Sequence, residues 1–215
     1  MINAITFDDV ADYVIGRSDR ARADLARYFG AFSVTSSGHT GYTGRFFEHY
    51  AQRSDPAHFN GNDIAAASAL SVQFDPITVA AIAHDAQHLD DLLAQCPPPK
   101  VPIWDVEDAV INDEAPLAQL YERLKGVPGV GYVKASKLLA AKRPHLVPIR
   151  DRRVEQLLGN PDQWWAPWQK VMKKEAFRSL LAELADGVAP PDASLLRVLD
   201  VILWCDATRQ DTGAD

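Results

Sequence analysis

The chain has 215 residues, of which 47% are hydrophobic and 24% charged, with a formal net charge of −7. These values are typical of a globular protein with its own core, and no apolar run approaches the ~20 residues that span a bilayer. The early residues predict no signal peptide and the two cysteines predict no disulfide framework, so we expect a cytoplasmic protein that binds no membrane.

The spacing of apolar residues in the first half of the chain predicts helices. They are expected over residues 7–28 with a break near Gly16, from Asn62 or Asp63 to about Val72, from Pro76 to Ala86, and from there to about Gln95. Residues 33–45 are rich in Gly, Ser and Thr, and predict a loop or at most a short hairpin.

The segment Cys96–Lys100 reads CPPPK and is the best candidate for a stiff break in the chain. It would separate an N-terminal helical part, residues 1–96, from a C-terminal helical part, residues 101–215. We expect these parts to form one compact unit, with two lobes as the alternative.

The second half of the chain also predicts helices joined by short connections. They are expected near residues 106–110 and over 116–125, 132–143, 151–158, 161–185 and 193–206. Residues 126–131 predict a tight turn, and 144–149 an extended stretch. The fold class is therefore all-α and multi-helix.

Basic residues gather in one part of this acidic chain. Eight of them, with the single acid Asp151, lie between Lys125 and Arg153, which gives that segment a charge of +7 and leaves −14 for the rest. A nucleic-acid binder needs a local basic surface rather than a basic chain, although most such clusters are ordinary solvated helix faces.

The predicted turn between two helices has the chemistry of a phosphate-binding element. Gly129 and Gly131 permit positive φ and remove side chains from the turn, so that backbone N–H groups face outward at the start of the next helix. Val130 would point inward and anchor the turn, while Lys134 and Lys137 would add positive charge beside it. An ordinary helical hairpin with a glycine turn is the alternative.

The segment LAQLYERLKGVPGVGYVKASKLLAAKR, followed by PHLVPIRDRRV, resembles the helix-hairpin-helix DNA glycosylase superfamily over residues 116–159. In that family a catalytic aspartate follows the hairpin by about twenty residues, and Asp151 lies twenty positions after Gly131. The resemblance implies a two-lobed helical fold, double-stranded DNA as partner, and a carboxylate that supports cleavage of an N-glycosidic bond. Asp151 is equally well placed as a plain helix N-cap.

The same resemblance implies two further properties. Val133 stands where bifunctional members carry a lysine nucleophile, so no lyase activity is expected, and the four-cysteine cluster of some members is absent. Backbone carbonyls near Lys125 and Val127 would hold a monovalent cation, Na⁺ or K⁺. No side-chain metal site is expected, because His84 and His88 alone supply too few ligands.

An extruded base requires a pocket with aromatic walls. The candidates are Tyr42 and Arg45 in the glycine-rich loop and Trp164 and Trp165 after Asp151, with Trp168 and Trp204 as further candidates, although each aromatic ring is individually typical of a core position. The whole chain is also similar to an uncharacterised bacterial family, through YTGR at 42–45, the GVG, ASKLL and KRP segments, and SLLRVLD at 194–200.

The first interpretation is therefore a DNA-binding protein built like a monofunctional DNA glycosylase. The second is a non-enzymatic helix-hairpin-helix module that binds DNA and uses Asp151 only as a cap. The third is a scaffold of the same fold with no DNA role, which the charge of −14 outside the basic segment favours.

Overall fold

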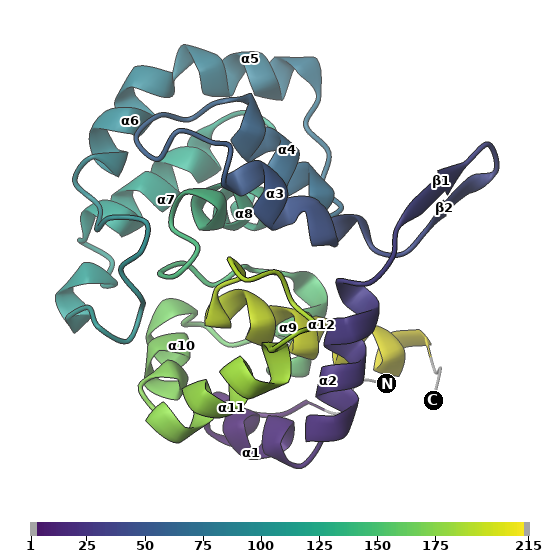
Figure 1. The fold of residues 1–215 in the computed structure, drawn as a ribbon. Coiled ribbons are helices and arrows are strands. Elements are labelled where there is room, and N and C mark those ends of the chain that lie inside the picture. Colours follow the sequence, from purple (N-terminus) through teal and green to yellow (C-terminus); the bar gives the residue numbers. More distant parts are fainter. Residues whose placement is uncertain (1–3, 213–215) are drawn as a thin grey trace. The chain divides into compact units, whose positions relative to one another are not determined.

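The computed structural model describes residues 4–212 and is drawn in Figure 1. Those residues contain twelve α-helices, three short 3-10 helices and one two-stranded hairpin. The prediction of an all-α, multi-helix fold is confirmed. None of the helices in this range combines the length and apolar composition that crossing a bilayer requires.

The chain divides into two compact units. Unit 1 contains the residues up to Tyr42 and those from Arg150 onward, and unit 2 contains Thr43–Ile149. The divisions fall after Tyr42 and after Ile149, whereas the predicted break at Cys96–Lys100 lies inside unit 2. Two segments distant in the sequence thus build unit 1, which a boundary placed by proline content does not anticipate.

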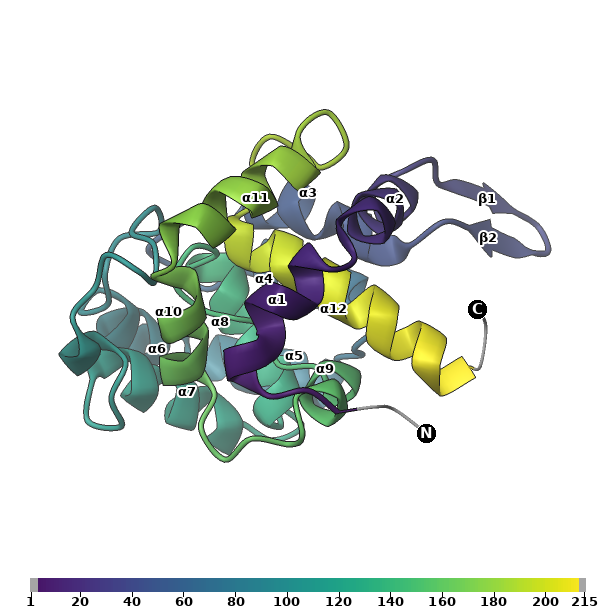
Figure 2. The same ribbon diagram turned by 90° about the horizontal axis from the view of Figure 1, so that it is seen from below.

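Unit 1 is a helical bundle around the long C-terminal helix. Its helices are α1 (Val10–Ile15), α2 (Ser18–Tyr28), α9 (Arg152–Leu157), α10 (Trp165–Met172), α11 (Glu175–Ala185) and α12 (Leu195–Thr212), preceded by a 3-10 turn at Phe7–Asp9. Helix α12 packs against α2, and Figure 2 shows α1 crossing in front of it. Leu199 and Leu203 are fully buried on α12, so this helix forms the centre of the unit's core.

Polar contacts fix the helices around α12. The hydroxyl of Tyr13 on α1 donates to Asp206 Oδ2 on α12 at 2.7 Å, and burial together with this carboxylate raises the pKa of Tyr13 to about 12. The guanidinium of Arg22 on α2 donates to the carbonyls of Glu183, Leu184 and Asp186 at 3.0, 3.1 and 2.9 Å. A cation there satisfies the unpaired carbonyls at the C-terminal end of α11.

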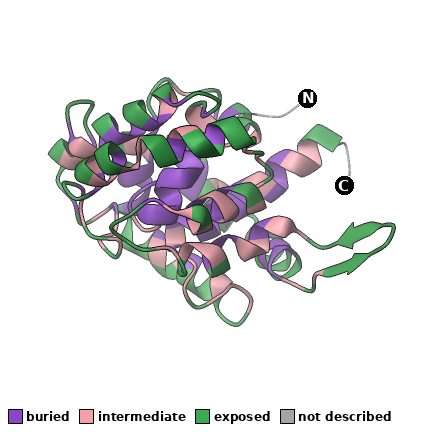
Figure 3. Cartoon of the chain, turned by 90° about the horizontal axis from the view of Figure 1, so that it is seen from above, coloured by how far each residue is buried: buried purple, intermediate pink, exposed green. Residues whose placement is uncertain are grey.

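The glycine-rich segment forms an exposed hairpin that follows α2. Strands β1 (Ser33–Thr35) and β2 (Gly38–Thr40) pair antiparallel, with Ser33 opposite Thr40. Of the two predicted alternatives, a loop or a short hairpin, the structure shows the hairpin. All six strand residues are exposed (Figure 3). The hairpin ends at Gly41, which has a φ of +83°; a Cβ at this position would lie 2.4 Å from the Ala31 carbonyl oxygen, so there is no room for a side chain.

Unit 2 contains the remaining helices. They are the 3-10 turn Thr43–Phe46, α3 (Phe47–Ala51), α4 (Gly61–Ala69), α5 (Pro76–His84), α6 (Ala86–Leu93), the 3-10 turn Asp108–Val110, α7 (Pro116–Gly126) and α8 (Tyr132–Lys142). Helix α8 packs against α3, α4 and α7, and its residues from Ala135 to Lys142 are all buried. It is the central helix of this unit.

Local capping explains where the helices of unit 2 begin. Asp75 accepts the Thr78 N–H at 2.8 Å and Pro76 is the first residue of α5, as the sequence predicts. Helix α4 begins earlier than expected, because Asn60 accepts the Asn62 N–H while Asp63 accepts the Asn60 N–H, both at 2.8 Å. This reciprocal capping box makes Asn60, rather than Asn62 or Asp63, the N-cap.

Candidate nucleic-acid interface

The predicted turn joins α7 to α8 in unit 2. Helix α7 ends at Gly126, the turn occupies residues 127–131, and α8 begins at Tyr132. Val130 is 1% exposed and its N–H donates to the Val127 carbonyl at 2.9 Å, so it anchors the turn inward as its predicted role requires. The buried side chains of Leu120, Leu124 and Leu138 supply apolar surfaces of α7 and α8.

The two glycines of the turn differ in backbone conformation and in the space around them. Gly129 has a φ of +81°, and a Cβ there would lie 2.0 Å from Thr78 Oγ1. Gly131 has φ −74° and ψ 177°, is exposed, and has no heavy atom within 4 Å of a Cβ position. Gly129 therefore adopts the positive φ that glycine permits, whereas Gly131 does not, and its extended backbone is one that any residue can adopt.

Helix α8 begins without a side-chain cap, since its N-cap residue is Gly131. The first N–H groups of an α-helix have no acceptor inside the helix, and the aligned peptide dipoles place partial positive charge there. The Lys134 ammonium lies on the same turn, because it donates to the Gly129 carbonyl at 2.6 Å and is 5.2 Å from the Phe74 ring. A cation and a helix N-terminus thus lie together.

Lys137 does not belong to this surface, contrary to the prediction that it binds phosphate. It is 3% exposed, and its ammonium donates to the Leu70 carbonyl at 2.9 Å. Leu70 is the C-cap of α4, so Lys137 places its charge at the negative end of that helix. The spacing of Lys137 from Lys134 could not indicate that Lys137 is buried, because the α4 residue that it contacts is distant in the sequence.

Two further basic residues of the +7 segment are internal. Lys142 and Arg143 are 2% and 4% exposed; Lys142 pairs with Asp63 at 2.6 Å, and Arg143 donates to the carbonyls of Leu93 and Pro56 at 3.0 and 3.1 Å. With Lys137, three of the eight basic side chains are therefore buried. The segment is not the basic surface that its composition suggests.

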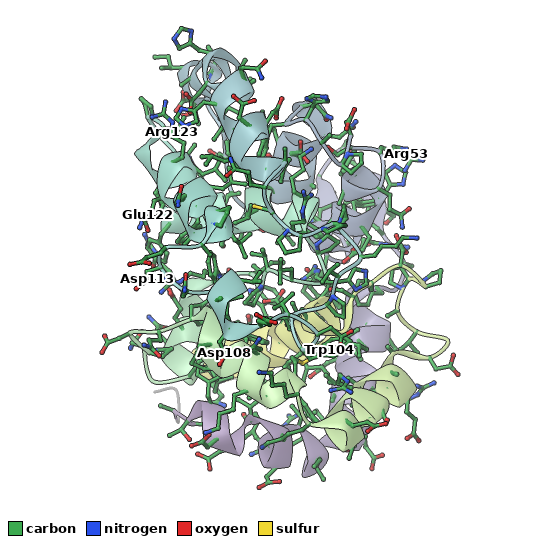
Figure 4. The ribbon with its side chains drawn as sticks, turned by 90° about the vertical axis from the view of Figure 1, so that its left-hand side faces the viewer. Arg53, Trp104, Asp108, Asp113, Glu122 and Arg123 are labelled. Atoms are coloured by element: carbon green, nitrogen blue, oxygen red, sulfur yellow. The ribbon has the colours of Figure 1, made fainter. Side chains whose placement is uncertain are left out.

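The exposed side of α7 carries acid as well as base. Figure 4 shows Glu122 and Arg123 on the outer side of this helix. Glu122 pairs with Lys125 at 2.6 Å, and Arg123 pairs with Asp85 of the α5–α6 junction. The positive charge nearest the turn is thus Lys134, and Lys125 is partly neutralised by its neighbour.

Asp151 lies in unit 1 and begins α9. It is half-buried, and its carboxylate accepts the Arg153 N–H at 3.1 Å, so the predicted N-cap is confirmed. Glu155 holds the Arg150 guanidinium with distances of 2.8 and 2.5 Å, and Arg153 reaches Thr208 at 3.2 Å and Asp211 at 3.7 Å. Glu155, Thr208 and Asp211 thus supply acceptors to the two arginines that flank α9's first turn.

Two of the predicted pocket aromatics are core residues. Trp164 and Trp168 are 5% and 1% exposed, and both rings contact Phe7, with centroids 6.0 and 5.8 Å apart. Trp164 is therefore packed inside unit 1, as is typical of a core position, while Trp165 beside it is half-buried. Trp164 also lies under the Arg150 guanidinium, at 5.2 Å.

The two loop candidates fall in different units. Arg45 belongs to unit 2, where its guanidinium lies 5.5 Å from the Phe46 ring. Tyr42 belongs to unit 1 and stacks on Tyr28 with centroids 5.1 Å apart. It meets Trp204, one of the further candidates, at 5.8 Å. Tyr28 was missed because nothing near it in the sequence indicates that residues of α2 and α12 converge there.

The carbonyls proposed for a monovalent cation lie at the end of α7. The Val127 carbonyl accepts the Val130 N–H, and the nearby Gly129 carbonyl accepts the Lys134 ammonium. A second positive charge beside that ammonium would be repelled, so this turn fits a cation poorly. In the part of the chain that the structure describes, no three His, Cys, Asp or Glu side chains form a group that could hold a metal ion.

The chain belongs to the Family of unknown function (DUF6308), which residues 21–207 match. Membership in an uncharacterised family is thereby confirmed. No curated protein matches the chain. No solved structure matches it. The resemblance to DNA glycosylases stays a prediction.

Proposed function

We propose that this member of the DUF6308 family binds the phosphate backbone of duplex DNA through the turn at residues 127–131. The observation that carries the proposal is the start of α8: Gly131 is exposed, no side chain caps the helix, and the Lys134 ammonium lies on the turn. Backbone N–H groups at a helix N-terminus bind phosphate oxygens, and a neighbouring ammonium adds charge. Such contacts bind DNA without reading its sequence.

The few exposed cations near this turn limit how strongly it depends on salt. Each phosphate neutralised contributes about 0.9 to the slope of log K against log salt. With Lys134 and the partly neutralised Lys125 as the nearby cations, we expect a slope of magnitude about 1–2 by the same relation. A steep slope would require a larger basic surface than this turn offers.

Gly131 provides the decisive variant. Gly131→Asp is accommodated sterically, because nothing lies within 4 Å of its Cβ, and it places a negative charge where phosphate would bind. We expect it to abolish binding of a labelled duplex in fluorescence anisotropy at low salt. Gly131→Ala is the matched control, since it occupies the same space without charge and should bind like the parent chain. Equal affinity of the aspartate and alanine variants would refute the turn as the binding site.

A second candidate function is N-glycosidic cleavage supported by Asp151. Its carboxylate is half-buried at a helix start, and Glu155 holds the guanidinium of the preceding Arg150. A carboxylate at the reacting sugar would stabilise oxocarbenium charge or position a water molecule. Asp151 lies twenty positions after Gly131, the spacing that the glycosylase resemblance implies.

Asp151→Asn separates this chemistry from capping. Asparagine caps a helix about as well as aspartate, so the variant should keep its melting temperature while losing the charge. Duplexes that carry varied base lesions would be incubated with the parent chain and the variant, and abasic sites counted by alkaline cleavage. We expect product only with the parent chain. Equal product with both proteins, or no product from any lesion, would leave Asp151 as a cap and the chain as a binding module.

The monovalent cation is tested by the same anisotropy measurement. If carbonyls of Lys125 and Val127 hold Na⁺ or K⁺, replacing both ions with tetramethylammonium at constant ionic strength should weaken duplex binding. Unchanged affinity would mean that the Lys134 ammonium alone supplies the charge at this turn.

A further inference from the structure

A cavity of about 250 Å³ lies in unit 1 between α2 and the end of α12, at the base of the exposed hairpin. The residues that line it include Arg20 and Arg27 of α2, Tyr42, and Trp204, Thr208 and Arg209 of α12. A larger and more open recess of about 610 Å³ adjoins the hairpin and shares Arg27 and Tyr42 with it. Neither the turn at residues 127–131 nor Asp151 contributes to these cavities.

The aromatic wall of the cavity is held by ring contacts. Tyr42 stacks on the buried Tyr28 with an interplanar angle of 14°, and the edge of Trp204 meets both tyrosine rings, with centroids 5.8 and 5.9 Å apart. The Tyr28 hydroxyl accepts a hydrogen bond from Arg197 at 2.7 Å, which fixes the innermost ring. Tyr42 and Trp204 are half-buried and line the cavity, so each presents ring surface to it.

The charged wall is positive, although aspartates neutralise part of it. Asp24 accepts from Arg27 at 3.1 Å and from Arg209 at 2.6 Å, and Asp206 accepts from Arg209 at 2.9 Å. Arg20 is exposed and, among the described residues, its side chain has neither an ion pair nor a hydrogen bond. Three arginines against two aspartates leave a positive charge, and it resides at the rim, on Arg20 and the 56% exposed Arg27.

The positions of the two rim arginines follow from the helix. Arg20 and Arg27 are seven residues apart on α2, which places them two turns apart on nearly the same face. Their guanidinium groups offer forked N–H donors that match phosphate oxygens. Burial raises the pKa of the Cys205 thiol, which also lines the cavity, to about 12, so it contributes a neutral surface.

We propose that this cavity binds a nucleotide, with the base against Tyr42 and Trp204 and the phosphate on Arg20 and Arg27. Ligand pockets usually have volumes of about 300–1,000 Å³. The cavity lies just below this range, so it admits the ring system while the phosphate remains at the rim. Stacking on aromatic side chains accepts every base, and an arginine pair adds affinity for the phosphate. The nucleotide is either free or part of a single DNA strand.

The proposal predicts that base and phosphate both contribute to binding. Titration calorimetry of the full chain with dAMP is expected to give saturable binding. Deoxyadenosine and inorganic phosphate, which each carry half of the ligand, should bind at least about tenfold more weakly. A ten-residue oligo(dA) distinguishes the sources: tighter binding than dAMP indicates a strand, and weaker binding indicates a free nucleotide.

Arg20→Gln is the variant least able to disturb folding, because this side chain is exposed and has no partner among the described residues. It should weaken dAMP binding at least about tenfold, the cost of losing a charge-assisted phosphate contact. Arg152→Gln, an exposed arginine on α9, is the matched control and should leave the affinity unchanged. Gly131→Asp should also leave dAMP binding unchanged, which distinguishes failure of this proposal from failure of the duplex site.

Indole N–H signals in a ¹⁵N–¹H spectrum show directly whether the base binds beside Trp204. The Trp204 signal is identified by its loss in Trp204→Phe, which keeps an aromatic ring in the wall. On titration with dAMP the Trp204 signal should move, whereas those of the buried Trp164 and Trp168 should not. Absence of dAMP binding, equal binding of phosphate and dAMP, or an Arg20→Gln variant that binds like the parent chain would each overturn the proposal.

Discussion

Gly129 is the position in the turn where the backbone conformation requires a glycine. Its φ of +81° disfavours any side chain, and a Cβ would lie 2.0 Å from Thr78 Oγ1 at the start of α5. We expect Gly129→Ala to lower the free energy of unfolding by about 2 kcal/mol or more, from backbone strain and the clash together. Urea denaturation followed by circular dichroism measures the change.

Two controls separate the causes of that loss. Gly131→Ala should change stability by less than about 0.5 kcal/mol, because its backbone is extended and the space around it is open. Thr78→Ala removes the hydroxyl that a new methyl group would meet, so the double variant with Gly129→Ala should lose less stability than the two single changes added together. A destabilised Gly131→Ala variant would contradict this distinction between the glycines.

At the scale of elements, the sequence predicted the features that depend on neighbouring residues and did not predict contacts between residues distant in the chain. Four local features were predicted: the start of α5 at Pro76, the cap at Asp151, the start of α7 at Pro116 and the turn before Tyr132. A helix start, cap or turn depends on residues within four positions. The capping box at Asn60 is equally local and was missed, since two later polar residues were preferred there.

The burial of basic side chains from the +7 segment could not be predicted from neighbouring residues. Lys137 donates to a carbonyl 67 positions away in the sequence, and Arg143 to one 87 positions away. Composition shows that a positive charge is present, but only the packing of α8 against α4 and the preceding loop shows that it is internal. Residues on the buried face of a helix can carry charge when another element offers carbonyl or carboxylate acceptors.

Lys142 connects three elements of unit 2. Its ammonium contacts Asp63 of α4 and, in the loop before that helix, Ser54 Oγ and the carbonyls of Asp55 and His58, all at 2.5–2.7 Å. Burial lowers the pKa of Lys142 and raises the pKa of Asp63, although each stabilises the charged form of the other. Four oxygen acceptors around one cation hold this loop against α8.

Removing that cation should be costly. Lys142→Met leaves the buried carboxylate of Asp63 without its partner, so we expect a loss of about 3–5 kcal/mol in the free energy of unfolding. Hydrogen exchange should also become faster in the loop at residues 54–58, which loses three acceptor contacts. A second change, Asp63→Asn, removes the unpaired charge and should restore part of the stability. If the double variant is no more stable than Lys142→Met, the carboxylate is not the source of the loss.

At the scale of the whole molecule, the two units differ in continuity. Unit 2 is one uninterrupted stretch, Thr43–Ile149, whereas unit 1 needs segments from both ends of the chain. The acceptors described above for Lys137, Lys142 and Arg143 belong to unit 2. Its core includes its own fully buried leucines, Leu89, Leu93, Leu117, Leu120, Leu124, Leu138 and Leu139. A compact unit with its own core and a continuous chain has what independent folding requires.

We therefore expect a fragment of residues 43–149 to fold alone. It should give a helical far-ultraviolet circular dichroism spectrum and a single cooperative thermal transition, because a small domain of this kind usually unfolds in two states. The same fragment carrying Lys142→Met is the control, and it should melt at a lower temperature if its core is the native one. A non-cooperative transition, or a melting temperature that Lys142→Met does not change, would show that residues of unit 1 are needed to complete this core.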